Sequence, residues 1–472
     1  MGLRFGTDGV RGVAGTEVTP ELVLALGRAA ARVLCPADAS GRRIVVARDS
    51  RRSGPLLEAA FAAGAAAEGV DVERLGVLPT PGLARVAAAE GVAAAMVSAS
   101  HNPFGDNGIK LFAAGGLKLE AAAERALEEV LDEVLGSPAG EVGGAAGDRL
   151  GAIVEREAAA GAYVDALVAS FTPRALDGLV VVVDCANGAA SAVAPAALSR
   201  LGAWVEVLAD TPDGVNINAG CGSTHPEPLQ AAVVAVGADL GLALDGDADR
   251  VLAVDAAGAL VDGDQLIALF ADDLRSRGLL RHDAVAVTVM SNLGLRLALA
   301  ERGIGVVETP VGDKHVLEAL RADDLALGGE QSGHIIFSDV AMTGDGTYTG
   351  LALVDLLART GVPLHELVGR AMVRLPQVLR NVTVADRDGL ASAPAVWAAV
   401  AEVEAELGDH GRVLLRPSGT EPLVRVMVEA TTEAQAMSAV DRLVAAVSSS
   451  LGSVAPVARA EPLAAWVPER RL

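Results

Sequence analysis

Residues 43–77 read RIVVARDSRRSGPLLEAAFAAGAAAEGVDVERLGV. A β-branched run gives way to a polar turn, an Ala- and Leu-rich helical pattern, a Gly, and a second short strand. The same order recurs, with little sequence identity, in residues 179–208 and 284–309. This strand, helix, strand order is typical of βαβ units, so the sequence predicts three similar α/β domains with mixed sheets.

A further apolar run follows each unit, at residues 93–97, 239–244 and 325–328, and a polar loop comes directly after each run. The loops read SASHNP, DGDADR and GEQSGH. Ligands in open α/β sheets bind outside the carboxyl ends of the strands. We therefore expect the three loops at equivalent sheet edges, where they would line one central cleft.

The last hundred residues follow another pattern. A strand-like stretch and a helical one (395–408) precede two strands that flank the loop 416–422, and a final helix covers 433–449. This order predicts a smaller C-terminal α+β domain whose loop faces the same cleft. A chain of 472 residues is too long for one hydrophobic core, and the Gly/Ala-rich stretch 136–152 is its clearest linker. The predicted domains are residues 1–150, 151–252, 253–368 and 369–472.

The charge balance excludes some partners. The chain has 38 basic and 61 acidic residues and a net charge of −23, which disfavours nucleic acid and anionic membranes. An anionic substrate would need clustered Arg or Lys, and only three basic residues are lysines: Lys110, Lys118 and Lys314. Three cysteines without a CxxC pair, and the absence of an apolar signal or membrane-spanning run, lead us to expect a cytoplasmic protein.

The DGDADR loop predicts a metal site. Asp245, Asp247 and Asp249 alternate, and in an extended segment such residues point to one side. Three unpaired carboxylates would repel one another, and oxygen-only ligands favour Mg²⁺ or Mn²⁺. An EF-hand is excluded because its sixth and twelfth positions hold Arg250 and Ala256. A solvated acidic turn is the alternative.

The RPSGTEPLVRV loop (416–426) predicts a phosphate site, because turn amides and two guanidinium groups match the oxygens of a phosphate. An ordinary turn between strands is the alternative. The GEQSGH loop (329–334) suits sugar hydroxyls, but equally suits a capped turn. The stretch SASHNPFGDNGIK (98–110) has no G-x-S-x-G pattern, so a serine facing the metal and phosphate loops would carry a phosphoryl group rather than an acyl group.

These four loops, in this order, resemble the signature motifs of the α-D-phosphohexomutase superfamily, and the likeness extends along nearly the whole chain. In chain order, SASHNPFGDNGIK resembles its phosphoserine loop, DGDADR its metal loop, GEQSGH its sugar loop and RPSGTEPLVRV its phosphate loop. FGTDGVRG (5–12), ARDSRRSG (47–54) and PDGVNINAGCGSTHP (212–226) extend the resemblance. The tail 461–472 is assigned no role.

The resemblance implies a role for each matching residue. Ser100 would be the phosphorylated serine and, through its phosphoryl oxygen, a metal ligand beside the three aspartates. Lys110 would be a general acid or base, with His101, Arg11 and Arg250 also catalytic. The residues that would bind substrate are Glu330, Ser332, His334, Lys314, Arg416, Ser418, Gly419, Thr420 and Arg425.

The implied reaction interconverts glucosamine 6-phosphate and glucosamine 1-phosphate through the phosphoserine and a 1,6-bisphosphate. It would supply UDP-N-acetylglucosamine and cell-wall precursor synthesis. Mg²⁺ would be the cofactor, glucosamine or glucose 1,6-bisphosphate the activator, and a small sugar phosphate the partner, for a monomer or homodimer.

Three rival functions stay open from the sequence. The same chemistry could act on mannose or glucose phosphates. A phosphatase could use DGDAD as an Asp-nucleophile motif. A non-catalytic sensor could bind sugar phosphates without turning them over.

Overall fold

The computed structural model of the chain describes residues 9–36, 41–138, 143–418 and 422–452. These residues form two compact units. The first holds the described residues up to Met290 together with Gly303–Ala371. The second holds Ser291–Arg302 and the described residues from Met372 onward. The domain boundaries near residues 150, 252 and 368 stay predictions.

The predicted strand–helix–strand unit is present three times and is followed each time by the predicted apolar strand; each copy also contains a second helix that the sequence did not indicate. The first copy is β2 (Arg43–Arg48), α2 (Gly54–Ala67), β3 (Asp71–Val77), α3 (Thr80–Glu90) and β4 (Ala93–Val97). The second is β8 (Val180–Asp184), α6 (Val193–Arg200), β9 (Trp204–Leu208), α7 (Glu227–Val236) and β10 (Leu240–Leu244). The third is β13 (Ala284–Thr288), α9 (Leu293–Glu301), β14 (Gly305–Thr309), α10 (Asp313–Ala322) and β15 (Leu327–Gly329).

The three copies share one sheet topology. Their parallel strands run β4-β2-β3, β10-β8-β9 and β15-β13-β14, so the first strand of each copy lies in the middle. An antiparallel strand then pairs with the last one: β5 (Asp106–Ala113), β11 (Val251–Asp255) or β16 (Ile335–Phe337). Each polar loop joins such a pair. The loops therefore occupy equivalent positions at the carboxyl ends of β4, β10 and β15, as predicted.

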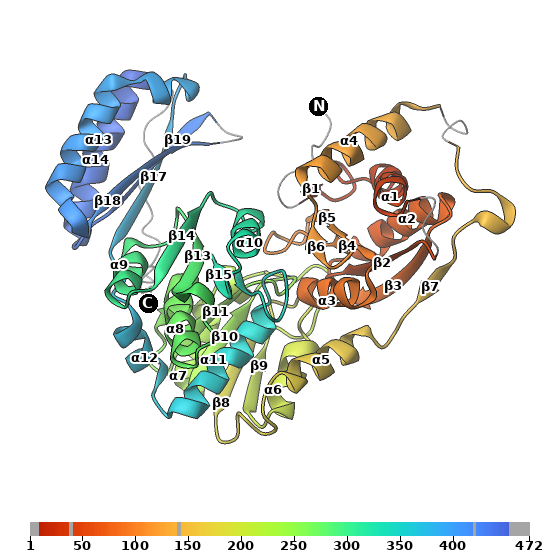
Figure 1. The fold of residues 1–472 in the computed structure, drawn as a ribbon, viewed down its shortest axis with the longest axis horizontal. Coiled ribbons are helices and arrows are strands. Elements are labelled where there is room, and N and C mark those ends of the chain that lie inside the picture. The colour runs from red at the N-terminus through yellow and green to blue at the C-terminus, as the bar shows by residue number, and fades with distance from the viewer. Residues whose placement is uncertain (1–8, 37–40, 139–142, 419–421, 453–472) are drawn as a thin grey trace, which may run out of the picture. The chain divides into compact units, whose positions relative to one another are not determined.

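Other elements complete the first unit. They are β1 (Val10–Val13), α1 (Pro20–Leu34), β6 (Leu117–Lys118), α4 (Ala121–Gly136), β7 (Ile153–Glu155), α5 (Ala159–Ala169), β12 (Leu260–Val261), α8 (Gly263–Ser276), α11 (Gly346–Thr360) and α12 (Leu364–Ala371). Figure 1 shows α1, α2 and α4 on one face of the first sheet and α3 on the other.

The Ala- and Gly-rich helices α1 and α2 pack with their backbones close together. A Cβ at Gly64 would lie 2.1 Å from the carbonyl oxygen of Leu24, and one at Gly27 would lie 2.2 Å from that of Phe61. Both glycines are buried, and the surrounding core consists mostly of Ala, Val, Leu and Ile. Small residues at the crossing thus allow the two helices to cover the sheet as one layer.

The second unit contains an antiparallel sheet of order β17-β19-β18 and two helices. Its elements are β17 (Gln377–Thr383), α13 (Pro394–Leu407), β18 (Arg412–Pro417), β19 (Leu423–Glu429) and α14 (Glu433–Leu451). It has its own Val-rich core. The predicted fold class, three α/β domains and a smaller α+β domain, is therefore confirmed.

Helix α9 from the third repeat belongs to this second unit. The buried carboxylate of Glu429 in β19 accepts hydrogen bonds from the backbone N–H of Leu293 and the side-chain amide of Asn292, at 3.0 and 3.2 Å. It also pairs with Arg412 at 2.6 Å. One buried carboxylate thus anchors the start of α9 to the small sheet.

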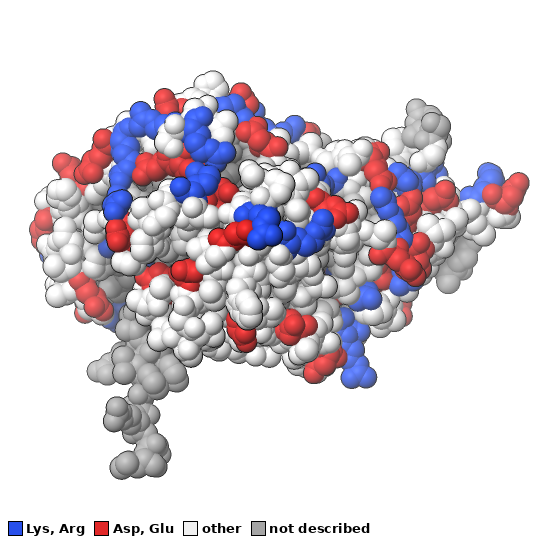
Figure 2. Space-filling view, turned by 90° about the horizontal axis from the view of Figure 1, so that it is seen from below, with Lys and Arg blue, Asp and Glu red and all other residues white. Residues whose placement is uncertain are grey.

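Within the described residues, no helix is long and apolar enough to cross a membrane. Figure 2 shows basic side chains interspersed with acidic ones over the face that it presents.

Candidate active site

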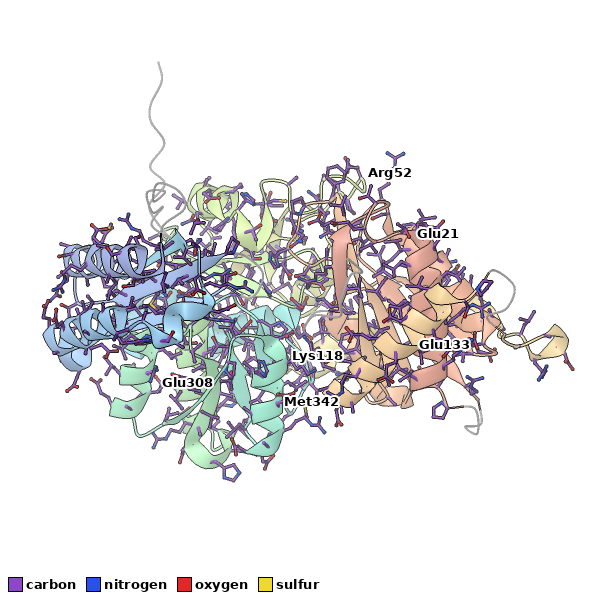
Figure 3. The ribbon with its side chains drawn as sticks, turned by 90° about the horizontal axis from the view of Figure 1, so that it is seen from above. Glu21, Arg52, Lys118, Glu133, Glu308 and Met342 are labelled. Atoms are coloured by element: carbon purple, nitrogen blue, oxygen red, sulfur yellow. The ribbon has the colours of Figure 1, made fainter. Side chains whose placement is uncertain are left out.

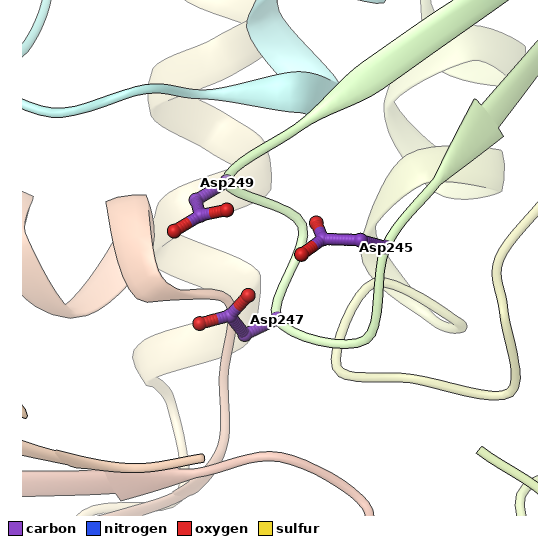
Figure 4. A group of neighbouring side chains, drawn as sticks. All are labelled: Asp245, Asp247 and Asp249. Carbon is purple, nitrogen blue, oxygen red and sulfur yellow. The ribbon is translucent and has the colours of Figure 1, made fainter. Parts of the chain in front are cut away.

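The three aspartates of the DGDADR loop converge in the structure (Figure 4). Each offers a carboxylate oxygen, and these three oxygens all lie within 4.8 Å of one another. The loop is a turn rather than an extended segment, with Ala248 in the left-handed region at φ 55°. The predicted convergence is therefore correct, but its predicted cause, strand alternation, is wrong. A turn between β10 and β11 brings the carboxylates together.

Burial makes this cluster electrostatically unusual. Burial, together with the charges of Asp249 and Asp247, raises the pKa of Asp245 well above its ordinary value. Burial also acts to raise the pKa of Asp249, but the Lys110 ammonium and then the nearby His334 ring hold this pKa well below its ordinary value. Lys110 likewise lowers the pKa of Asp247 against burial.

The donor set fits a metal ion. The Oδ1 atoms of Asp247 and Asp249 are buried and have no hydrogen-bond partner among the described residues. Two unsatisfied anionic oxygens in a buried cluster are costly unless a cation binds them. All three donors are carboxylate oxygens, which hard divalent cations prefer. The site is therefore built to hold such an ion.

Ser100 lies against this cluster from the first domain. Its Oγ donates a hydrogen bond to Asp245 Oδ2 at 2.5 Å, although the two residues are 145 positions apart. The side chain is buried, and the backbone is left-handed at φ 51°, which is uncommon for a residue other than glycine. The loop thus turns this side chain inward onto the metal loop.

Lys110 lies in β5 and reaches the same cluster. Its Nζ is 2.8 Å from Asp247 Oδ2 and 3.2 Å from Asp249 Oδ2. Thr80, at the start of α3, donates to Asp247 Oδ2 at 2.7 Å. A single threonine at the first position of a helix carries no signal of its own, so the sequence does not point to Thr80.

His101 and two arginines surround the serine. The Nδ1 of His101 is 3.3 Å from Ser100 Oγ. Burial, then the charges of Arg250 and Arg11, lowers the pKa of His101 to about 4, so its ring is neutral at pH 7. The Nε of Arg250 lies 3.8 Å from Asp249 Oδ1. The structure thus brings both predicted arginines close enough to act on this histidine.

The sugar loop joins the same assembly through its backbone. The N–H of Val251, just after the metal loop, donates to the carbonyl of Gly333 at 3.1 Å. Glu330 accepts a hydrogen bond from the N–H of Gly312 at 3.1 Å, and Ser332 lies beside it. The Nε2 of His334 accepts a hydrogen bond from the N–H of Gly344 at 3.0 Å, and its Nδ1 faces Asp249.

Lys314 lies near the sugar loop but is engaged elsewhere. Its Nζ is 2.8 Å from Glu124 Oε1 in α4. The neighbouring Asp313 pairs with Lys118, which is labelled in Figure 3. Two ion pairs therefore connect the first residues of α10 to the β6 and α4 region. The structure does not bring Lys314 into contact with Glu330 or Ser332.

The predicted phosphate loop lies in the second unit. Arg416 in β18 and Arg425 in β19 are direct partners across the two strands, and both are exposed. Like charges directly opposite each other destabilise a sheet, so a bound anion would offset a real cost. The carbonyl of Ser418 accepts a hydrogen bond from Arg387, a third cation that the sequence analysis did not identify. Gly419 and Thr420 lie outside the described residues.

Comparisons with known proteins match the chain to one family along most of its length. The family models for phosphoglucomutase/phosphomannomutase match in order: alpha/beta/alpha domain I (residues 2–135), domain II (161–258), domain III (262–375) and the C-terminal domain (379–446).

Relatives and solved structures cover nearly the whole chain. The phosphoglucosamine mutase of Mycolicibacterium paratuberculosis is 54% identical over 95% of this chain and 100% of its own length. That of Desulforudis audaxviator is 51% identical over 95% and 98%. A phosphoglucomutase/phosphomannomutase family protein from Burkholderia thailandensis superposes with a TM-score of 0.79 at 29% identity, over 94% of this chain and 97% of its own.

A further solved structure shows the same fold at lower identity. It is the N-acetylphosphoglucosamine mutase of Aspergillus fumigatus in complex with GlcNAc-6P and magnesium, at TM-score 0.68 and 21% identity, covering 95% of this chain and 96% of that one. With four family models in order and relatives above half identity, the chain belongs to the phosphoglucomutase/phosphomannomutase family of the α-D-phosphohexomutase superfamily.

Proposed function

We propose that the chain is an isomerase that interconverts glucosamine 6-phosphate and glucosamine 1-phosphate. The main support is the 2.5 Å contact between Ser100 Oγ and the buried aspartate cluster, in a chain that is 54% and 51% identical to two phosphoglucosamine mutases. These relatives favour the amino sugar over mannose or glucose phosphates. Production of glucosamine 1-phosphate would feed UDP-N-acetylglucosamine and cell-wall precursor synthesis in the cytoplasm.

Ser100 carries the phosphoryl group in this proposal. The P–O bond to Ser100 breaks as a bond to O1 of the sugar phosphate forms, which yields the 1,6-bisphosphate. The bisphosphate then reorients in the site, its 6-phosphoryl group is transferred to Ser100, and the sugar 1-phosphate is released. Glucosamine 1,6-bisphosphate, or glucose 1,6-bisphosphate, would therefore also load a serine that lacks its phosphoryl group.

Each transfer moves one proton as well. The attacking hydroxyl must lose a proton, and the oxygen that leaves must gain one. His101 is neutral at pH 7 and its Nδ1 lies 3.3 Å from Ser100 Oγ, so it can exchange a proton with the serine. Lys110 holds its ammonium between Asp247 and Asp249 and supplies positive charge or a proton beside the same oxygen.

The three aspartates would hold Mg²⁺, with a phosphoryl oxygen on Ser100 as a further ligand. When bound, this ion offsets negative charge on the transferring group. Glu330, Ser332, His334 and Lys314 are the proposed sugar-side residues. Arg416, Ser418, Gly419, Thr420 and Arg425 are the proposed phosphate grip, and Arg11 and Arg250 the remaining cations.

Catalytic efficiency on glucosamine, mannose and glucose 6-phosphates tests the substrate. We expect kcat/KM to be highest for glucosamine 6-phosphate, and a clear preference for a neutral sugar would overturn the assignment. Ser100→Ala should abolish turnover. If that variant instead keeps turnover and releases free phosphate, the aspartates act as a phosphatase nucleophile.

Intact mass separates the remaining alternative. Incubation with glucose 1,6-bisphosphate should add one phosphoryl group to the wild-type chain and none to Ser100→Ala. A wild-type chain that binds sugar phosphates but never gains this mass is a sensor rather than a mutase.

A further inference from the structure

The carbonyl oxygen of Ser100 is the meeting point of three chain segments. Arg51 Nη2 donates to it at 2.8 Å, and the side-chain amide of Asn218 donates to it at 2.9 Å. Gly246 of the metal loop packs so closely that an added Cβ would lie 2.6 Å from this oxygen. Arg51, Asn218 and Gly246 of the metal loop thus all contact the carbonyl oxygen of Ser100.

Arg51 holds the serine loop as a whole. Its side chain is fully buried, and its Nε pairs with Asp49 at 2.9 Å. The guanidinium also donates to four carbonyl oxygens of the loop and its end, those of Ser100, Asn102, Pro103 and Asp106. A planar fork with five N–H groups suits this task, and an ammonium would not reach the same set.

Asp49 extends this hold to the serine's own N–H group. Asp49 Oδ2 accepts a hydrogen bond from Ser98 Oγ at 2.7 Å, and Ser98 Oγ accepts one from the N–H of Ser100 at 2.9 Å. Both backbone polar groups of Ser100 are therefore bound by one connected network. This network keeps Ser100 in its left-handed conformation, which is costly for a residue other than glycine.

Asn218 repeats part of this hold from across the chain. Its Nδ2 donates to the carbonyls of Ser100 and Asn102, the same two that Arg51 Nη2 binds. The duplication is not needed for satisfaction, because each carbonyl already has a donor from Arg51. Asn218 instead fixes the serine loop relative to the segment that follows β9, because it donates to the loop from that segment.

Backbone contacts next to Arg51 reinforce the same junction. The N–H of Arg52, labelled in Figure 3, donates to the carbonyl of Gly214 at 2.8 Å, and Ser50 Oγ donates to that of Asn187 at 2.5 Å. Residues 50–52 therefore touch the second repeat on both sides of the buried arginine. Residues 50–52 thus help to hold the serine loop next to the metal loop.

We propose that Arg51 and Asn218 are positioning residues that fix Ser100 relative to the metal loop during phosphoryl transfer. The proposal rests on the proposed mutase function. Neither side chain needs to touch substrate. Their effect is on the geometry of the reacting oxygen, where a displacement of about 1 Å can cost about 100-fold in rate.

The test uses Asn218→Gly in the full-length chain. Asn218 is left-handed at φ 57°, a conformation that glycine adopts without strain, so this variant removes the amide and keeps the turn. Arg51 still satisfies both carbonyls, so folding should be preserved. The matched control is Asn216→Ala, which removes side-chain hydrogen bonds to Asp213 and Thr211 in the same loop but none to the serine loop.

The readout is kcat per phosphorylated serine, from turnover divided by the phosphoryl stoichiometry measured by intact mass. We expect Asn218→Gly to lower it about 100-fold, with KM changed less than about 3-fold, and Asn216→Ala to leave it near wild type. Equal kcat per phosphorylated serine in Asn218→Gly and wild type overturns the proposal, as does an equal loss in both variants. A wild-type chain without mutase turnover would contradict the proposed function instead.

Discussion

The serine and metal loops differ from the two strands of the proposed phosphate site in burial and in hydrogen bonding. Ser100, Lys110 and the aspartates are buried and joined by hydrogen bonds across the first unit. Arg416 and Arg425 lie exposed on a small sheet with its own core in the second unit. If the proposed function holds, this difference predicts rigid positioning at Ser100 and a mainly electrostatic contribution from Arg416 and Arg425.

Neutralising one aspartate should separate activity from stability. Burial beside two other carboxylates raises the pKa of Asp245, so its charge at pH 7 is a cost in the metal-free chain. We expect Asp245→Asn to raise the Tm of the metal-free protein by a few degrees and to lower kcat by about 1,000-fold. Thermal unfolding in EDTA and turnover with Mg²⁺ measure the two effects.

A fall in both Tm and kcat would mean that the cluster stabilises the fold. In that case the burial of the aspartate cluster would reflect its role in folding rather than its role in catalysis. Asp255→Asn is a matched control, because that aspartate caps the turn after β11 and lies outside the cluster.

Removing a cation from the grip should act on binding. We expect Arg425→Ala to lower kcat/KM by about 10- to 100-fold, mostly through KM, because a charge-assisted hydrogen bond to phosphate is worth about 1.5–3 kcal/mol. Stability should hold or rise slightly, since Arg416 loses a like-charged partner. Steady-state kinetics and Tm measure this, and a loss confined to kcat would contradict a binding role.

The buried contact between α5 and α11 makes the first unit sensitive to pH. Burial raises the pKa of Asp345 to about 6, and the Tyr163 hydroxyl, donating at 2.6 Å, opposes this. A raised pKa gives stability that is complete below about pH 4 and is lost as pH rises through about 6. Tyr163→Phe should cost about 1–2 kcal/mol at pH 7 and extend that loss to higher pH.

Thermal unfolding between pH 4 and 8 measures this effect. Tyr348→Phe is a control, because Tyr348 reaches Asp345 only through its backbone N–H and keeps its ring contacts. Identical pH profiles for Tyr163→Phe and wild type would show that the hydroxyl does not act on Asp345.

The smallest effect concerns Lys314. Its ammonium pairs with Glu124, whereas the family resemblance makes it a substrate residue. If substrate draws Lys314 away, Glu124→Gln should lower KM about 2-fold, because a partly exposed ion pair is worth under about 1 kcal/mol. The gain should shrink in high salt. An unchanged KM at low salt would leave Lys314 a structural residue.

The sequence predicted the repeat, the four loops and their order, because hydrophobic periodicity and short motifs are local. It did not predict that Arg51, Asn218 or Thr80 would converge on the serine and metal loops. Each lies far along the chain from what it binds, and none has a local pattern that reveals its partner. The antiparallel strands β5, β11 and β16 were missed for another reason. β11 and β16 have only five and three residues, and β5 begins with the polar residues Asp106 and Asn107, which are typical of a turn.

The scarcity of lysine gives the molecule a set of chemical reporters. All three lysine side chains form ion pairs, Lys110 with the metal loop, Lys118 with Asp313 and Lys314 with Glu124, and their side chains are 6%, 13% and 12% exposed. Amine-reactive labels should therefore modify the folded chain slowly. Modification of Lys110 would report separation of the serine and metal loops. Modification of Lys118 or Lys314 would report separation of α10 from the first domain, so one peptide map could follow both motions during turnover.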